Sequence, residues 1–439
     1  MNYQQFFSGK KITLMGLGLL GRGIGDAQFL AKYASELIVT DLKSEQELKS
    51  SVSKLRKYKN IKFVLGEHRL ADFRNRDLII KSAGVSLKSI YLDEAKKHKI
   101  PVLMSTAIFA QFAQEMGVKI IGITGTRGKT TTTKLIYEIL EKSVPRLRSG
   151  QKNPQIFLGG NIQGLATLEL LNKVKTGDLA VLELDSWQLQ GFGDLKISPN
   201  IAVFTNFLAD HLNYYGGSMK KYFADKSNIF KYQNKQAGDK LFWGGQVASI
   251  PKNWKIELPG EHNQNNIALA IAVARELKIP EKVIKKVVEN FAGVAGRLEL
   301  VKVWRGIKIY NDTTATTPDA TLVALQVLAV PRLRSGQNQN IVLILGGADK
   351  SLDMNELLKN LAKYCKKVIL LPGTGTEKIK SKIKNKILVN SLAEAVKTAL
   401  AECERGDILL FSPAFASFGM FRNEYERGEK FLTTLAGLR

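Results

Sequence analysis

Short apolar runs alternate with longer amphipathic stretches along most of the 439 residues. In the first hundred residues the runs are KITLMGLG (11–18), ELIVTD (36–41), KFVLG (62–66), DLIIKSAG (77–84) and PVLMS (101–105). Runs this short and this continuously apolar are typical of strands buried on both faces. With helical spacers between them, they predict a parallel sheet covered by helices.

The pattern returns twice further along the chain. A middle section contains LAVLELD (179–185) and PNIAVFTN (199–206), followed by the helical pattern HNQNNIALAIAVARELK (262–278). A last section contains IKIYND (307–312), IVLILGG (341–347), KKVILLPG (366–373) and DILLFSP (407–413). We therefore predict an α/β protein with three domains, at residues 1–106, 107–296 and 297–439, because a chain of this length exceeds one core.

Composition narrows the class of protein. The chain is 44% hydrophobic and 24% charged, which is typical of a globular protein. Its two cysteines, Cys365 and Cys403, have no metal-type spacing and predict a reducing compartment. The N-terminus lacks the pattern of a signal peptide, and no apolar run is long enough to cross a bilayer. We expect a cytoplasmic protein without membrane insertion.

The net charge of +25 raises the possibility of a nucleic-acid or anionic-membrane partner. The basic residues are scattered, however, and no aromatic–basic nucleic-acid signature is present, so we favour a lysine-rich surface and expect no nucleic-acid partner.

The octapeptide VPRLRSGQ occurs at 144–151 and again at 330–337. Both copies fall between a helical and a strand pattern, where insertions are tolerated, so we interpret them as insertions without a catalytic role.

A glycine pattern follows the first expected strand. Gly16, Gly18 and Gly21 form GxGxxG before a helical stretch, and Asp41 ends the next strand. Such a turn lets a pyrophosphate approach the backbone N–H groups at a helix N-terminus, and Asp41 could accept from ribose hydroxyls. On its own this pattern is a weak signal, since some such turns only pack a helix on a strand.

A second phosphate-type loop is more specific. GITGTRGKTTTTK (122–134) lies between an apolar run and a helical one. Gly125 and Gly128 provide backbone donors, Lys129 an ammonium for the β- and γ-phosphates, and Thr130 a hydroxyl for Mg²⁺. The spacing differs from GxxxxGK[ST], because Gly122 is one residue too far back. The sequence thus predicts two anion sites on two domains.

Polar residues also follow two strands of the middle section. Glu183 ends one strand, and Asp210 and His211 follow another. Carboxylate and imidazole groups at strand ends beside a phosphate loop are candidate metal ligands. A lone histidine is more often structural, and Lys226 by itself would be interpreted as a solvated lysine.

The order of the motifs resembles the Mur ligases over nearly the whole chain. The shared segments include GITGTRGKTTTTK, GGNIQG, LELDSWQL, TNFLADHLNYYGGSMKKYFADKSNIF, LPGEHNQNN, YNDTTATTPDA, LILGGADKS and SPAFASFGMFRNEYERGEKF. The branch that adds D-glutamate to UDP-N-acetylmuramoyl-L-alanine is the most similar. The two VPRLRSGQ segments are foreign to this pattern.

The resemblance implies a Rossmann-like N-terminal domain for the UDP-substrate, a central P-loop-type ATPase domain and a Rossmann-like C-terminal domain for the amino acid. The positions that match UDP-substrate contacts are Gly18, Leu19, Leu20, Asp41, Gly84 and Asn161. Those that match ATP contacts are Thr124, Gly125, Thr126, Arg127, Gly128, Lys129, Thr130, Asn263, Asn266, Arg297 and Asp312.

The resemblance also implies two Mg²⁺ sites, one held by Thr130 and Glu183 and one by His211 and Lys226, with Lys226 carbamylated by CO₂. Lys129, His211 and Lys226 would be the catalytic residues. The amino-acid pocket would consist of Thr316, Lys350, Ser417 and Phe418. The implied substrates are ATP, UDP-N-acetylmuramoyl-L-alanine and glutamate, and the implied state is a monomer.

Three positions depart from the family pattern. Asp185 stands where a serine is common, Thr314 where many members have a lysine, and Glu424 where some have an aromatic residue. We expect Glu424 to point away from the amino acid, or to pair with Arg422 or Arg427.

Alternatives stay open at this point. L-glutamate or another acceptor, as in other Mur ligases or a folylpolyglutamate synthetase, would fit the same catalytic residues. A nicotinamide oxidoreductase would account for GxGxxG but not for the second loop. A basic ATPase acting on nucleic acid would rest on the charge alone.

Overall fold

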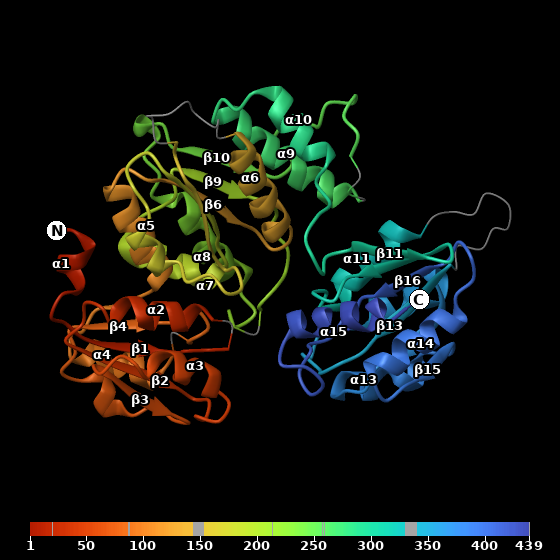
Figure 1. Cartoon of the computed structure of the whole chain (residues 1–439), viewed down its shortest axis with the longest axis horizontal. Helices are drawn as coiled ribbons and strands as arrows, with labels where there is room; N and C mark the ends of the chain where they lie inside the picture. The colour runs from red at the N-terminus through yellow and green to blue at the C-terminus, as the bar shows by residue number, and fades with distance from the viewer. Residues whose placement is uncertain are drawn as a thin grey trace. The chain divides into compact units, whose positions relative to one another are not determined.

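The computed structural model describes residues 1–19, 21–86, 88–143, 153–212, 214–256, 258, 260–329 and 340–438. The chain forms two compact units (Figure 1). The first consists of residues 1–255 and 261–290, and the second of residues 256–260 and 291–439. The first unit contains two parallel sheets and the second contains one mixed sheet.

The N-terminal sheet has the order β3-β2-β1-β4-β5, and all of its strands are parallel. The strands are β1 (Lys11–Met15), β2 (Glu36–Asp41), β3 (Ile61–Leu65), β4 (Leu78–Lys81) and β5 (Val102–Leu103). Helices α2 (Arg22–Leu30) and α3 (Lys49–Leu55) pack on one face and α4 (Ile90–Lys97) on the other, with α1 (Tyr3–Phe7) at the start of the chain. The strand order reverses next to β1, the usual place for a ligand in such a sheet.

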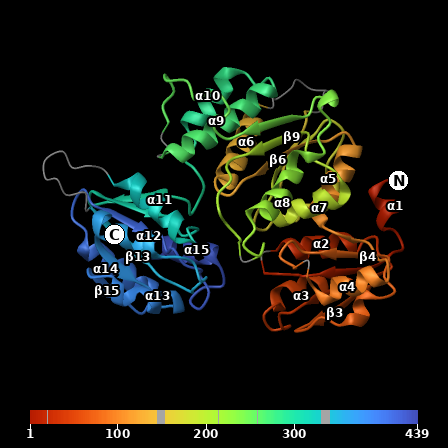
Figure 2. The same cartoon turned by 180° about the vertical axis from the view of Figure 1, so that it is seen from behind.

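The central sheet has the order β10-β9-β6-β8-β7 and is also entirely parallel. Its strands are β6 (Lys119–Thr124), β7 (Ile156–Gly160), β8 (Leu179–Glu183), β9 (Ile201–Phe204) and β10 (Lys240–Trp243). Helices α6 (Lys129–Ser143), α9 (Glu261–Glu276) and α10 (Glu281–Glu289) pack together, as do α5 (Ser105–Glu115), α7 (Ser186–Leu195) and α8 (Met219–Lys231). Figure 2 shows these two groups on opposite sides of the sheet.

One continuous hydrophobic core joins the two sheets of the first unit. It runs from Phe7 and Phe29 through Phe109 of α5 to Phe192 and Phe204, all of them fully buried. Because the two sheets share this core, side chains at the facing ends of both sheets can contribute to one site.

The second unit has the sheet order β11-β12-β16-β13-β14-β15. Its strands are β11 (Glu299–Trp304), β12 (Ile307–Asn311), β13 (Ile341–Leu345), β14 (Cys365–Leu370), β15 (Lys386–Leu388) and β16 (Ile408–Phe411). Helices α11 (Pro318–Leu328), α12 (Asn355–Tyr364) and α13 (Thr374–Ile379) contribute to the core on one face. Helices α14 (Leu392–Glu402) and α15 (Glu424–Ala436) cover the other.

The α/β fold with parallel sheets is confirmed, and each apolar run quoted above is a strand of one of the three sheets. Strand β11 is the exception to the parallel arrangement, because a tight turn at Arg305 and Gly306 folds it back against β12. The strands β10, β11 and β15 were not anticipated. The domain boundaries at 106 and 296 stay a prediction, and both VPRLRSGQ copies lie outside the described residues.

Phe204 provides a test of the shared core. Its ring is fully buried and stacks on Trp243 at 4.2 Å. We expect Phe204→Ala to lower the free energy of unfolding of the first unit by about 3–5 kcal/mol, since it leaves a cavity between β9 and β10. Urea-induced unfolding followed by circular dichroism measures this change. The exposed Ile90 of α4 provides the control, where truncation to alanine should cost less than about 0.5 kcal/mol. Equal effects of the two substitutions would contradict the assigned core.

Candidate functional site

The loop between β6 and α6 is a tight cradle of backbone groups. Gly125 and Gly128 have φ of +141° and +82°, conformations that favour glycine. A Cβ at Gly125 would lie 1.9 Å from Thr205 Oγ1, and one at Gly128 would lie 2.2 Å from Asn266 Oδ1. The loop therefore needs glycine at both positions for conformation and for space, as its sequence predicted.

The segment after β9 holds this loop in place. Asn206 accepts a hydrogen bond from the Arg127 N–H through Oδ1 (2.9 Å) and one from the Thr126 N–H through its carbonyl (3.0 Å). Leu208 N donates to Thr126 Oγ1 (2.9 Å). The sequence analysis assigned no role to Asn206, although its position at the end of a strand beside the loop was a usable signal.

Two lysines converge on one carbonyl of the loop. Lys129 Nζ donates to the carbonyls of Gly125 (3.0 Å) and Thr126 (3.1 Å). Lys226 Nζ, from α8, donates to the same Gly125 carbonyl (2.7 Å) and to Thr124 Oγ1 (3.3 Å). The Lys226 side chain is 1% exposed, so burial, reinforced by the nearby charge of Lys129, lowers its pKa well below the ordinary value. Lys226 is thus not the solvated lysine that its local sequence suggested.

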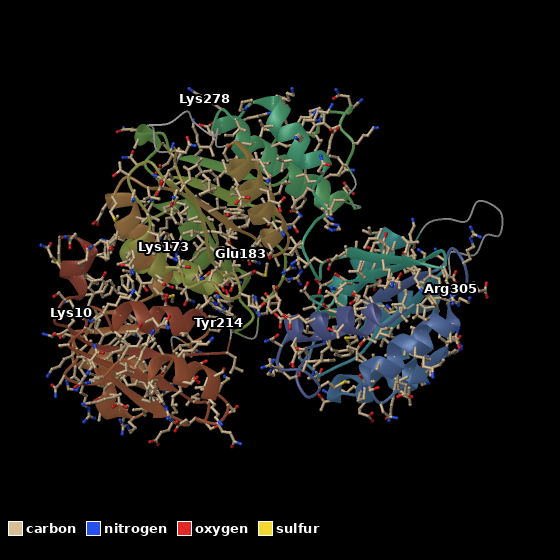
Figure 3. The ribbon with its side chains drawn as sticks, in the orientation of Figure 1. Lys10, Lys173, Glu183, Tyr214, Lys278 and Arg305 are labelled. Atoms are coloured by element: carbon tan, nitrogen blue, oxygen red, sulfur yellow. The ribbon has the colours of Figure 1, made fainter. Side chains whose placement is uncertain are left out.

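Glu183 is the last residue of β8 (Figure 3). The β6–β8 register pairs it with Ile123, directly before the loop. Its Oε1 accepts a long hydrogen bond from Asn161 Nδ2 (3.4 Å), whereas its buried Oε2 has no hydrogen-bond partner among the described residues. A buried carboxylate oxygen without a partner is costly, so this atom is suited to a cation.

His211 and Asp210 lie between β9 and α8, in the segment that also carries Tyr214 (Figure 3). Arg127 Nη1 of the loop pairs with Asp210 Oδ2 (2.7 Å), and the His211 ring packs on Trp187 at 4.8 Å. Burial lowers the pKa of His211, while the charge of Asp210 opposes that shift. The neutral imidazole, which is the form that can bind a metal, is therefore favoured.

The other predicted ATP residues fall in both units. Asn263 and Asn266 are buried at the start of α9, where Asn266 Nδ2 donates to Asn263 Oδ1 (3.4 Å) and packs against the loop. Thr130 is half-buried in the first turn of α6. Arg297 and Asp312 belong to the second unit. Asp312 accepts from Leu298 N (3.0 Å) and from Ser412 Oγ (2.7 Å), and its burial raises the carboxyl pKa to about 7.

A cavity of about 550 Å³ opens at the carboxyl ends of β1 and β4, and helices of the central sheet complete its wall. Of the residues predicted for the UDP-substrate, Gly18, Leu19, Asp41 and Gly84 line it. Leu20 lies outside the described residues. The Asp41 carboxylate accepts hydrogen bonds from the N–H groups of Gly18 (2.8 Å) and Lys43 (2.9 Å), so it also shapes the glycine turn.

Asn161 connects this cavity to Glu183. Its Oδ1 accepts a hydrogen bond from Arg22 Nη1 (2.7 Å), and Arg22 lines the cavity. Lys81 at the end of β4 lines it as well. The sequence analysis missed Arg22 and Lys81, because neither belongs to a recognisable motif.

The predicted amino-acid residues lie in the second unit. Lys350 Nζ donates to Thr316 Oγ1 (2.9 Å), which brings two of the four together. Ser417 is buried, whereas the Phe418 side chain is 64% exposed. These residues follow β12, β13 and β16, which are neighbouring parallel strands, so they share one edge of the sheet.

The structure shows the interactions of the three residues that depart from the family pattern. Asp185 caps α7 by accepting from Gln188 N (2.7 Å), and Thr314 Oγ1 donates to the carbonyl of Gly296 (2.8 Å). Among the described residues, Glu424 forms no ion pair within 4 Å, but its charge opposes the lowering of the Arg427 pKa by burial, so it interacts with Arg427 at longer range. The two candidate arginines are engaged elsewhere: Arg422 pairs with Glu426 (3.3 Å), and Arg427 donates to the carbonyls of Thr313 and Phe415.

The described residues contain no group of three or more His, Cys, Asp or Glu side chains arranged to hold a metal. None of their helices is both long and apolar enough to span a membrane. Both cysteines are free thiols.

Models of three Mur ligase domains match the chain in order. They are the MurD-like N-terminal domain at 10–104, the middle domain at 123–242 and the glutamate ligase domain at 296–415. Over nearly full length, the chain is similar to two proteins named UDP-N-acetylmuramoylalanine–D-glutamate ligase. The one from Roseiflexus is 33% identical over 97% of this chain and 98% of its own, and the one from Borreliella afzelii is 34% identical over 95% and 96%.

Among solved structures, the UDP-N-acetylmuramate–alanine ligase MurC of Thermotoga maritima is similar with a TM-score of 0.61. The two are 20% identical, and the match covers 98% of this chain and all of that one, which supports the shared fold. The three domain models in this order, and the sequence identity with full-length relatives, show that the chain belongs to the Mur ligase family.

Proposed function

We propose that this protein is an ATP-dependent ligase that joins D-glutamate to UDP-N-acetylmuramoyl-L-alanine through an acyl phosphate, in peptidoglycan precursor synthesis. The observation that carries the proposal is the convergence of Lys129 and the buried Lys226 on one carbonyl of a glycine-bounded loop. The backbone N–H groups of such a loop, together with the ammonium of Lys129, suit a polyphosphate. Similarity to full-length relatives with that ligase name supports the choice of substrates.

ATP would bind at the loop from Thr124 to Thr130. The N–H groups of the loop and the ammonium of Lys129 would hold the phosphates, and Asn263 and Asn266 of α9 lie against the same loop. Arg297 and Asp312, which the resemblance also assigns to ATP, belong to the second unit. Asp312 would act there mainly by holding its own loop, because both of its carboxylate oxygens already accept hydrogen bonds.

Two Mg²⁺ ions would fit the remaining groups. Thr130 and the unpartnered Oε2 of Glu183 would hold one, and His211 and Lys226 the other. Bound there, the ions would stabilise the charge of the transferring phosphoryl group. Since the described residues hold no conventional cluster of carboxylates and imidazoles, the second ion needs another anionic ligand.

Carbamylation of Lys226 would supply that ligand. Burial favours the neutral amine, whose nitrogen forms a bond to the carbon of CO₂ and releases a proton, leaving a carbamate anion. The carbamate would place an anion beside the ammonium of Lys129, so the two side chains would attract one another.

The reaction then follows from these positions. The substrate carboxylate attacks the γ-phosphorus, the bond to the bridging oxygen of ADP breaks, and an acyl phosphate forms. Lys129 stabilises charge on the transferring group. The amine of glutamate attacks the acyl carbon, phosphate leaves with its bonding electrons, and the amine loses a proton. Activation is needed because a free carboxylate is a poor acyl donor.

The UDP-substrate would occupy the cavity lined by Gly18, Leu19, Asp41 and Gly84, with Asn161 at the side that leads to Glu183. The resemblance also assigns Leu20, outside the described residues, to this substrate. Glutamate would bind to Lys350, Thr316, Ser417 and Phe418, where the ammonium of Lys350 would pair with a carboxylate. We propose a cytoplasmic monomer that acts on small molecules and not on nucleic acid.

The choice of amino acid gives the first test. We expect ligation to UDP-N-acetylmuramoyl-L-alanine with D-glutamate, weak ligation with D-aspartate and none with L-lysine, because the ammonium of Lys350 would attract an anionic side chain and repel a cationic one. Phosphate release and product mass measure the outcome. Product with L-glutamate alone would keep the acidic pocket and overturn the stereochemistry. Product with lysine and with neither glutamate would overturn the proposed function.

The metal site gives a second test. We expect Lys226→Ala to lower kcat by at least about a hundredfold, since it removes the proposed carbamate. Affinity for the UDP-substrate should stay nearly unchanged, because Lys226 does not line the cavity. Short carboxylic acids should restore part of the turnover.

Lys221→Ala is the matched control, because Lys221 is an exposed lysine of the same helix and its loss should leave turnover unchanged. If Lys226→Ala turned over like the wild type, the carbamate assignment would be wrong.

A further inference from the structure

A lysine without a charged partner lies buried in the wall of the substrate cavity. Lys81 is the last residue of β4, and its side chain is 2% exposed. Its ammonium has three donors. In the described part of the chain it makes one hydrogen bond, to the carbonyl of Val85 at 3.3 Å, and no carboxylate lies within ion-pair distance. Neither the family pattern nor the proposed reaction uses this residue.

Keeping Lys81 in this position costs stability. Burial lowers its pKa to about 8, which shows that the charged form is poorly solvated there. A buried ammonium with one long hydrogen bond is less stable than an apolar side chain of the same size. An anionic ligand in the cavity would supply the missing interactions.

The position of Lys81 indicates which anion it meets. The β1–β4 register pairs it with Met15, the residue before Gly16. Ser82, the next residue, packs against Gly16, where an added Cβ would lie 2.4 Å from its Oγ. Lys81 is therefore next to the glycine turn that leads into α2, where a helix N-terminus favours phosphate.

The carboxylates that interact with Lys81 limit the direction from which an anionic ligand can approach it. Asp185, Asp194 and Asp225, from α8 and the segment of α7 with its cap, all interact with the Lys81 charge at longer range. An anionic group between Lys81 and these side chains would be repelled by three carboxylates. The glycine turn carries no such charge except Asp41, which two N–H groups of the backbone already engage.

We propose that Lys81 is a substrate-binding residue that pairs with the diphosphate of the nucleotide sugar. The inference rests on the proposed function, since that function supplies the nucleotide sugar as the ligand. The diphosphate carries two negative charges, and Lys81 with Arg22 provides two cationic side chains in the wall of the same cavity. The buried Lys81 thus lowers the stability of the free protein, and its interaction with the diphosphate stabilises the complex.

The test compares Lys81→Met with the wild type and with Lys62→Met. Lys62 lies on β3 of the same sheet, outside the cavity, and pairs with Glu36 at 3.0 Å on the surface. Calorimetry gives the Kd of UDP and of UDP-N-acetylmuramoyl-L-alanine, with a non-hydrolysable ATP analogue present to fill the ATP loop. Thermal unfolding without ligand gives Tm.

For Lys81→Met we expect Kd to rise about tenfold or more for both ligands, since a charge-assisted contact is lost. Tm should be unchanged or higher. Lys62→Met should leave both Kd values within about twofold of the wild type. A fall in affinity together with a gain in stability separates a binding role from a purely structural one. Lys81→Gln, which keeps a polar group, should show the same rise in Kd if the methionine variant fails to fold.

An unchanged Kd for UDP in Lys81→Met would overturn the inference, and so would a large fall in Tm with unchanged affinity. A loss of affinity confined to the full substrate would also overturn it, because it would place the lysine at the terminal carboxylate. A wild-type protein that ligates D-glutamate while Lys81→Met binds UDP normally would leave the proposed function intact. If the wild type bound UDP through Lys81 but made no product, the inference about Lys81 would hold and the proposed function would be wrong.

Discussion

The carbonyl oxygen of Gly125 accepts hydrogen bonds from two lysines, and the organisation of the first unit depends on that contact. Two ammonium groups this close repel one another, and burial removes most of the water that would screen them. The arrangement is tolerable because one lysine can be neutral and because the loop presents a site for polyphosphate. The glycines and the brace from Asn206 keep the loop narrow enough for both lysines to reach one atom.

Poorly satisfied polar groups recur in the first unit. Among the described residues, Glu183 Oε2 is buried without a partner, Lys226 is buried beside another lysine, and Lys81 is buried with a single long hydrogen bond. Each lowers the stability of the free protein, and each would be relieved by a different part of the reacting complex. Parallel topology makes this possible, because neighbouring strands end at the same edge and bring distant segments together.

The local features could be predicted from the sequence, and the long-range ones could not. The loop from Gly125 to Thr130 was predictable because its glycines, lysine and threonine lie close together in the sequence, between a strand and a helix. The position of Glu183 followed from its place at a strand end. Lys81 also ends a strand, but its burial depends on helices more than 100 residues away, which no local pattern encodes. Glu424 and Arg427 interact without a direct ion pair, because backbone carbonyls hold the Arg427 guanidinium, a contact set by the fold of the second unit.

The central claim is that ATP activates the carboxylate of the substrate by forming an acyl phosphate. It can be measured directly with UDP-N-acetylmuramoyl-L-alanine whose terminal carboxylate carries ¹⁸O at both oxygens. If the γ-phosphoryl group is transferred to that carboxylate, each phosphate released with product will contain one ¹⁸O atom, detectable by mass spectrometry or by the ³¹P shift. Product formation with phosphate free of ¹⁸O would contradict the account, because the carboxylate oxygen would then never have been bonded to phosphorus.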